Sequence, residues 1–243
     1  MNSFLAVFKR ELKGYFETSL AYVFLVVFLF FSGYLTFRGG FFEARQADMQ
    51  AFFANMPLLF VFTVPAVAMR LWAEERKTGS IELLFTLPIT VTQVVTAKFF
   101  AALVFLAIAM TLTFPMVITV CYLGEPDIGL IITGYIGSLL MAGGFLAVGC
   151  FFSALSKNQV ISFVLSVVAC AILVFAGMPT TMNYLSTFLP AGLVSAISGF
   201  SFQSHFESIQ KGVLHFKDLS YFLLLITGWV VATAIILDER KAS

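Results

Sequence analysis

Long apolar runs separated by short polar stretches dominate the pattern along this chain. A membrane-crossing helix needs about 20 mostly apolar residues, within a range of about 17–25. Six runs meet that requirement: Leu20–Phe37, Met56–Leu71, Phe99–Leu123, Ile128–Phe152, Val160–Met178 and Tyr221–Leu237. Pro57 and Pro65 would bend the second run, and Pro115 the third. The pattern predicts an all-α polytopic membrane protein with six transmembrane helices in a single domain, residues 1–243.

A different periodicity precedes the first run. Apolar side chains recur every four positions, at Phe4, Phe8, Leu12 and Phe16. Lys9 and Lys13 lie off that stripe, so a helix over residues 1–17 would be amphipathic. We expect it to lie in the inner membrane surface, with its basic side toward anionic headgroups. The alternative is a plain extension of the first span.

Lysines and arginines near the span ends set the expected orientation. With both termini inside, the inner side carries ten of them: Lys9, Arg10, Lys13, Arg70, Arg76, Lys77, Lys98, Lys157, Arg240 and Lys241. The outer side then carries four: Arg38, Arg45, Lys211 and Lys217. We therefore expect a cytoplasmic N-terminus and a cytoplasmic C-terminus.

Composition supports membrane insertion and narrows the chemistry. The chain is 60% hydrophobic and 11% charged, against about 25% charged in soluble domains. A net charge of +1 gives no reason to expect nucleic acid as a partner. Three cysteines lie far apart in apolar runs, at Cys121, Cys150 and Cys170, and we expect them to be buried core residues.

Ionisable residues are expected only outside the six spans. Ion-coupled carriers and intramembrane enzymes need such groups at membrane depth, so we expect neither class and no catalytic residue. The sequence also lacks a phosphate-binding G-x-x-x-x-G-K-[ST] loop. If this is a pump, ATP and Mg²⁺ bind a separate subunit, and this chain holds no cofactor.

The polar stretch after the second run carries the signals of a short helix. Ser80 can cap a helix over Ile81–Thr86, with Glu82 in its first turn, where the helix dipole favours an acid. Pro88 then ends it, and the capping-box pattern Thr90–Gln93 begins the next helix. We expect the short helix to expose an apolar docking surface formed by Ile81, Leu84 and Phe85. The alternative is a surface-lying loop with no partner.

The fourth run contains small residues at four-residue spacing: Gly134, Ser138 and Ala142, then Gly149 and Ser153. Such stripes allow helix backbones to approach closely. We expect packing within the chain, with a dimer interface as the alternative.

Residues 179–220 form the one long outer connection. They are too apolar for a flexible loop and are broken by Pro190, Gly192 and Gly199. We expect short helices or a re-entrant hairpin in the outer leaflet. His205 and His215 make a poor metal site by themselves, and we expect His205 to hydrogen-bond Glu207.

Residues 74–90 resemble the signature of ABC type-2 transporter permeases, between the second and third spans. The positions that the resemblance assigns to coupling with an ATPase are Glu74, Glu75, Arg76, Gly79, Ser80, Ile81, Glu82, Leu84, Phe85 and Pro88. A second motif resembles the gliding-motility-type (GldF-like) and copper-maturation-type (NosY-like) branch. It consists of His205, Phe206, Glu207, Gly212 and Asp218.

The resemblance implies a half-transporter in a bacterial inner (cytoplasmic) membrane. The chain would pair with a second permease, identical or related, and with two copies of an ABC ATPase. It implies an elbow helix at 1–17, a coupling helix within the cytoplasmic loop 73–96, and re-entrant outer helices at 179–220. An accessory periplasmic-side protein is a further expected partner.

The expected function is that of a permease subunit that exports or extracts an unidentified substrate, using ATP hydrolysed by the separate ATPase. The alternative is a membrane subunit of a mechanical, assembly or signalling complex that transports nothing. A substrate-sized polar cavity between protomers would favour transport, whereas a closed apolar interface would favour the mechanical role.

Overall fold

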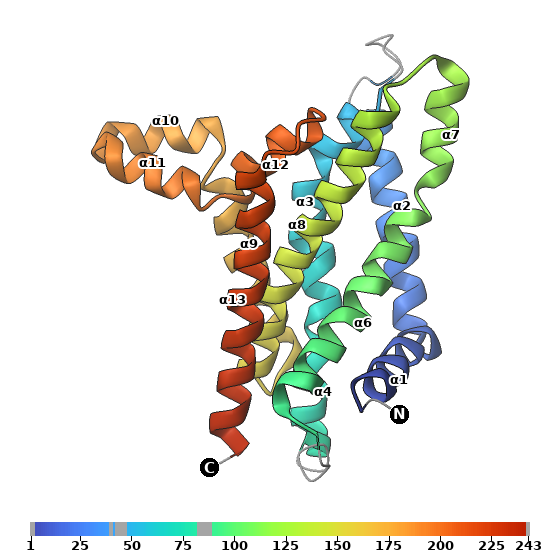
Figure 1. The fold of residues 1–243 in the computed structure, drawn as a ribbon, viewed down its shortest axis with the longest axis vertical. Coiled ribbons are helices and arrows are strands. Elements are labelled where there is room, and N and C mark those ends of the chain that lie inside the picture. The colour runs from blue at the N-terminus through green and yellow to red at the C-terminus, as the bar shows by residue number, and fades with distance from the viewer. Residues whose placement is uncertain (1–2, 39–40, 42–47, 82–88, 242–243) are drawn as a thin grey trace.

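The computed structural model describes residues 3–38, 41, 48–81 and 89–241. Within these ranges the chain is helical and contains no strand, as the sequence predicts. The helices are α1 (Ser3–Glu17), α2 (Ser19–Arg38), α3 (Gln50–Ala68), α4 (Arg70–Thr78), α6 (Val91–Thr111), α7 (Phe114–Leu123), α8 (Ile128–Leu155), α9 (Gln159–Phe175), α10 (Pro179–Phe188), α11 (Ala191–Gly199), α12 (Phe202–Gln210) and α13 (Phe216–Lys241). The long helices form an upright bundle, and an α10–α11 arm projects sideways from one end (Figure 1).

Among the described residues, five helical stretches are long and apolar enough to cross a membrane: Ser19–Arg38, Gln50–Thr78, Val91–Leu123, Ile128–Leu155 and Phe216–Glu239. A sixth crossing results if α9 and α10, which are bent by 80° where they join, count as one span. Both termini lie at the same end of the bundle (Figure 1), and that placement requires an even number of crossings.

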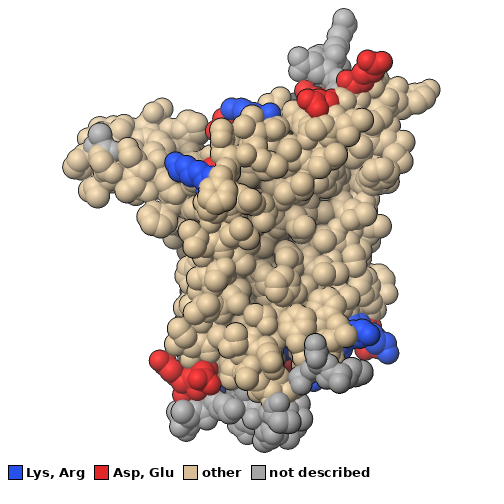
Figure 2. Space-filling view, in the orientation of Figure 1, with Lys and Arg blue, Asp and Glu red and all other residues tan. Residues whose placement is uncertain are grey.

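The sides of the bundle are apolar, whereas charged side chains gather at its two ends (Figure 2). Large apolar residues on the sides are exposed, among them Val26 (66%) and Phe30 (62%) of α2. A protein surrounded by water rarely exposes apolar surface of this extent, whereas a bilayer covers it at no cost. The chain is therefore a multi-pass membrane protein.

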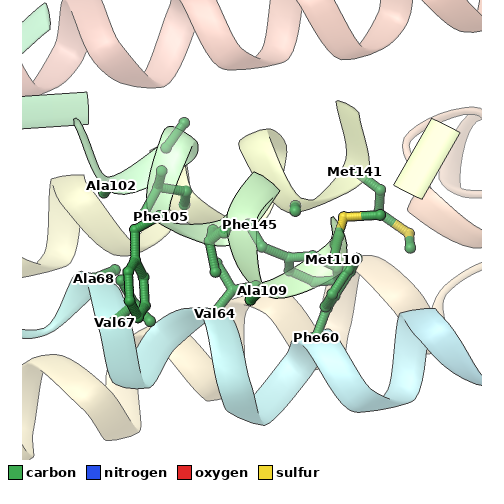
Figure 3. Close-up of a cluster of buried hydrophobic side chains, with 14 of the residues drawn as sticks. Phe60, Val64, Val67, Ala68, Ala102, Phe105, Ala109, Met110, Met141 and Phe145 are labelled. Carbon is green, nitrogen blue, oxygen red and sulfur yellow. The ribbon is translucent and has the colours of Figure 1, made fainter. Parts of the chain in front are cut away.

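The core lies where α3, α6 and α8 meet. Phe60 of α3, Phe105 of α6 and Phe145 of α8 are all fully buried there, and small residues between them bring the helices close (Figure 3). The rings of Phe60 and Phe145 meet edge to face, with centroids 6.4 Å apart. Edge-to-face pairs add to the burial of the rings themselves. These contacts hold α3 and α6, which lie before and after the connection that follows α4, against α8.

The predicted bend in the third span is a break. The α6 helix ends at Thr111, and α7 begins at Phe114 with Pro115 in its first turn. A proline is tolerated at that position because the first N–H groups of a helix have no intrahelical partner. Pro57 and Pro65 lie inside α3, and the N–H of Met69 donates to the Pro65 carbonyl at the junction with α4.

The small residues of α8 face neighbouring helices of the same chain. A Cβ atom added at Gly134 would overlap the ring of Phe53, and one at Gly149 would overlap the Ala68 methyl. Both neighbours belong to α3, so these glycines allow α3 and α8 to approach closely. The other three positions of the stripe are also buried: Ser138, Ala142 and Ser153.

One expectation about the cysteines is wrong. Cys150 and Cys170 are buried, but Cys121 is exposed. The reason is that α7, which carries Cys121, lies at the edge of the bundle (Figure 1) and buries only Val117 and Val120. An apolar run in a membrane protein therefore supplies lipid-facing residues as well as core residues.

The connection between α9 and α13 folds into three short helices, α10, α11 and α12. Of these, α12 packs into the bundle: Phe206 and Ile209 are fully buried, and Ile209 lies against Gly137 of α8. Gly212 follows in the left-handed region with φ of 85°, which glycine adopts at no steric cost. The connection is therefore a helical cap whose last element belongs to the core.

Candidate functional site

The connection between α4 and α6 is the candidate site, and its described parts begin at the end of α4. This helix runs through Glu74, Glu75 and Arg76 to Thr78, so the first three positions of the predicted motif lie in α4. Gly79 then ends it with φ of 73°. Glycine is the residue that most readily adopts this left-handed conformation at a helix end. The left-handed conformation required at this helix end therefore explains why residue 79 is a glycine.

Two residues after Gly79 are described: Ser80, expected as a helix cap, and Ile81, expected in the apolar docking surface. The Ser80 hydroxyl lies 2.9 Å from the Thr78 hydroxyl and donates to the Glu75 carbonyl at 3.5 Å, so it contacts the helix behind it. Ile81 is half-buried and packs against the core, although we expected it to be exposed. The remaining coupling positions, Glu82, Leu84, Phe85 and Pro88, lie outside the described residues.

The capping-box prediction for the next helix is confirmed at its N-cap. Thr90 is the N-cap of α6, and its hydroxyl accepts a hydrogen bond from the Gln93 N–H at 3.3 Å. This bond satisfies one of the N–H groups that begin a helix without a partner. The predicted loop 73–96 thus contains the end of α4 and the first turns of α6, with a shorter connection between them.

A buried ion-pair cluster, which the sequence reasoning missed, joins the two sides of this connection. Lys98 of α6 is 2% exposed, and its Nζ lies 2.8 Å from Glu75 Oε1 of α4 and 3.0 Å from Glu11 Oε2 of α1. Arg10 completes the cluster with Glu11 at 2.7 Å. The Lys98 ammonium also lies over the Trp72 ring, 5.1 Å from its centroid. Two carboxylates and two cations therefore connect three helices with no net charge.

Burial raises the pKa of the Glu11 carboxyl, but Lys98 and Arg10 lower it by more, so the pKa lies below its ordinary value. A carboxyl whose pKa is lowered by folding stabilises the fold when ionised. The stabilising effect is complete above the unfolded value of 4.5 and is lost as the pH falls below 4.5 through the lowered pKa.

We expect this loss to appear in thermal unfolding. The unfolding temperature of the detergent-solubilised protein should fall as the pH drops below 4.5. The variant Glu11→Gln should show a shallower fall over the same interval, because its side chain cannot titrate. An equal fall in both proteins would contradict the assignment to Glu11.

A second set of bonds joins α4 to α8. The Ser153 hydroxyl accepts from the N–H groups of Trp72 (3.0 Å) and Ala73 (3.1 Å) and donates to the Met69 carbonyl (3.0 Å). Arg76 donates to the Ala154 carbonyl at 2.6 Å. Ser153 therefore does more than provide space for packing. It satisfies backbone groups where α3 and α4 join, and it fixes α4 to the end of α8.

The predicted outer motif lies at the opposite end of the bundle, and one expected pairing there is wrong. His205 does not bond Glu207. Its Nδ1 lies 2.6 Å from Asp218 Oδ1, and its Nε2 lies 3.0 Å from the Gly199 carbonyl. Glu207 instead accepts from Lys211 at 2.7 Å on the exposed side of α12. Residues two apart on a helix face different directions, so His205 and Glu207 cannot share one contact surface.

The His205 ring contacts protein groups through both of its nitrogens and through one of its faces. It stacks on Tyr221 with centroids 4.0 Å apart, and the Tyr221 hydroxyl donates to the Phe200 carbonyl at 2.6 Å. A carbonyl oxygen only accepts, so Nε2 carries a proton. Both ring nitrogens are therefore occupied by protein partners. Among the described residues no three side chains of His, Cys, Asp or Glu lie close enough to share a metal ion.

The sequence model described as "ABC-2 family transporter protein" matches residues 9–177. The chain belongs to the ABC-2 transporter family. No curated protein matches it. The matched residues contain all of α4, α6 and α8, so the contacts of Lys98 and Ser153 lie inside the family region.

Members of the ABC-2 family are membrane subunits that are generally not catalytic themselves, and membership implies an ABC ATPase partner and a lipid bilayer. The match says nothing about a branch within the family. The resemblance of the outer motif to GldF-like and NosY-like proteins therefore stays a prediction.

Proposed function

We propose that this ABC-2 chain is the permease subunit of an ATP-driven transporter, and that its ATPase partner docks on the connection between α4 and α6, residues 79–90. One observation carries the proposal. The described ends of that connection are bound to α1, α6 and α8 through Lys98 and Ser153. A force applied to the connection would therefore reach α1 and α8 directly, in addition to α4 and α6 at its own ends.

The continuity of α3 with α4 favours the same conclusion. Residues Gln50–Thr78 form one helical stretch long enough to cross the membrane and continue beyond it. Its far end carries Glu75, and Lys98 faces Glu75 from the start of the next span. Closure of two ATPase subunits would move both spans together, because breaking a buried ion pair costs several kcal/mol. ATP and Mg²⁺ would bind the ATPase alone.

The distribution of charge supports the proposed orientation. The helix α1, the end of α4, the start of α6 and the end of α13 lie at one end of the bundle (Figure 1), where ten of the fourteen lysines and arginines are expected. Such an excess marks the cytoplasmic side, where ATP is found. We place α1 as the interfacial elbow helix, packed on α6 through stacked rings of Tyr15 and Phe105, 4.9 Å apart. The α10–α11 arm would lie in the outer leaflet of a bacterial inner membrane.

A second permease, identical or related, completes the proposed transporter, and the substrate would pass between the two. The two docking connections would then accept two ATPase copies. The lipid-facing surfaces described above leave room for such a partner on the sides of the bundle.

We expect Leu84→Asp to abolish docking. Leu84 lies outside the described residues, but it stands in the motif that the resemblance assigns to coupling. A charge placed in an apolar contact should reduce co-purification of the ATPase in mild detergent by at least about tenfold, or about 1.4 kcal/mol. ATP hydrolysis by the mixture should fall to that of the ATPase alone.

Lys157→Asp is the matched control, since Lys157 is exposed in the turn between α8 and α9. It adds an aspartate at the same end of the bundle, outside the proposed docking connection. If the ATPase still binds the Leu84→Asp variant but no longer binds the Lys157→Asp variant, it docks outside the connection between α4 and α6. Recovery of no ATPase with the unaltered chain would overturn the proposal.

A further inference from the structure

A polar cavity of about 540 Å³ lies at the end of the bundle opposite the α4–α6 connection. It is open to the surface and is lined by residues of α11 and α12, by His215 and by the first residues of α13. Ligand sites commonly have volumes of about 300–1,000 Å³, so this cavity is large enough for a small polar group. Its walls differ from the apolar sides of the bundle, since they contain hydroxyl groups, both histidines and a lysine.

Several hydrogen-bond donors in this cavity have no acceptor among the described residues. Ser204 and Ser208 line it, and their hydroxyls make no hydrogen bond within the part of the chain that the structure describes. Lys217 has no ion-pair partner there either, so its positive charge is uncompensated. The backbone N–H groups of Phe216 and Lys217 begin α13 and, among the described residues, donate to no carbonyl.

The two acids nearest to the cavity are already paired. Asp218 lines it, but its Oδ1 is bound to His205 at 2.6 Å. Glu207 is bound to Lys211 at 2.7 Å on the exposed face of α12. The free groups are therefore one cation and several donors. A tetrahedral oxyanion suits such a set, because each of its oxygens accepts hydrogen bonds and its charge pairs with the lysine.

We propose that this cavity binds a phosphate group, carried either by the headgroup of a membrane lipid or by a soluble phosphate ester. Aromatic side chains around it place it near a bilayer surface. Phe216 is 84% exposed at its wall, and Phe200 is 69% exposed beside it. Aromatic residues gather at the boundary between lipid and water, and Figure 2 shows charged side chains at this end of the molecule. The proposal requires membrane insertion and does not depend on ATPase docking at the other end.

Two binding measurements on the wild-type protein and two matched variants test whether the cavity binds phosphate. Lys217→Gln removes the free cation, whereas Lys211→Gln removes the neighbouring cation that belongs to the Glu207 pair and lies outside the cavity. Inorganic phosphate is titrated into the detergent-solubilised protein by calorimetry. Retention of phosphatidic acid is compared with that of diacylglycerol, which lacks only the phosphate, by native mass spectrometry from nanodiscs.

We expect saturable binding of at least one phosphate probe by the wild-type protein. Lys217→Gln should weaken it by about tenfold, the size of one charge-assisted hydrogen bond, and Lys211→Gln should leave it unchanged. Retention of phosphatidic acid alone assigns the site to lipid headgroups, and binding of inorganic phosphate alone assigns it to soluble ligands. Absence of both responses, or equal weakening by the two variants, would overturn the proposal. Unchanged unfolding temperatures would show that both variants fold.

Discussion

Replacing Lys98 with methionine is expected to lower the free energy of unfolding by about 3–5 kcal/mol, the usual cost of leaving buried charges without their partner. Lys98 is 2% exposed and bonds Glu75 and Glu11. Its loss leaves two carboxylates side by side with only Arg10, which is 56% exposed, to offset their charge. One of them already has a buried oxygen, Glu75 Oε2, with no hydrogen-bond partner among the described residues. Denaturant titration of the detergent-solubilised protein measures the change.

Two further variants test whether the loss of stability comes from the ion-pair cluster or from the removal of any lysine. Lys77→Met removes an exposed lysine of α4 and should change stability by no more than about 0.5 kcal/mol. The triple variant Lys98→Met, Glu11→Gln and Glu75→Gln removes Lys98 together with both carboxylates and leaves only Arg10, which is 56% exposed. It should regain most of the loss, because replacing buried ion pairs with uncharged residues is often neutral. A triple variant as unstable as Lys98→Met alone would show that packing of the lysine stem matters more than charge.

Replacing His205 with alanine is expected to cost about 3 kcal/mol or more at the opposite end of the bundle. The substitution leaves the Asp218 carboxylate, which is 8% exposed, without its partner. It also removes the ring that stacks on Tyr221 and the bond to the Gly199 carbonyl. Thermal unfolding in detergent measures the loss.

Glu207→Ala is the matched control, because Glu207 is the partner that the sequence alone favours. The exposed pair of Glu207 and Lys211 should contribute less than about 1 kcal/mol. A loss from Glu207→Ala as large as the loss from His205→Ala would support the sequence-based pairing against the structural one.

The sequence predicts the helical runs well because membrane insertion leaves few alternatives. A bilayer core offers no hydrogen-bond partner to the backbone, so long apolar runs must be helical. Element starts that depend on local bonds are also predictable: Thr90 caps α6 as expected. The ends of the runs are less predictable, since the second run is predicted to end at Leu71, whereas the helix continues and the next residue, Trp72, is fully buried in α4.

Contacts between residues distant in sequence account for most of what was missed. Lys98 lies 87 residues from Glu11 and 23 from Glu75, and its position at the start of a run resembles that of a solvated inner-side lysine. One signal was present. Lys98 follows Val91, Val94 and Val95 on the stripe that continues to Phe105, and all of these face the core. A lysine on the apolar stripe of a helix predicts a buried partner.

The pairing of His205 was missed for a related reason. Asp218 lies 13 residues from His205, beyond a turn at Gly212 that brings the start of α13 back against α12. Proximity in sequence favoured Glu207, although helix geometry argues against that pair.

The central claim is that an ATPase grips the connection between α4 and α6, and cross-linking in cells tests it most directly. A photo-reactive amino acid is placed at Lys77, exposed at the end of α4, and in a separate strain at Lys211, exposed at the other end of the bundle. We predict that an ATPase subunit is captured from position 77 and none from position 211. Capture from position 211 alone, or from neither position, would contradict the account.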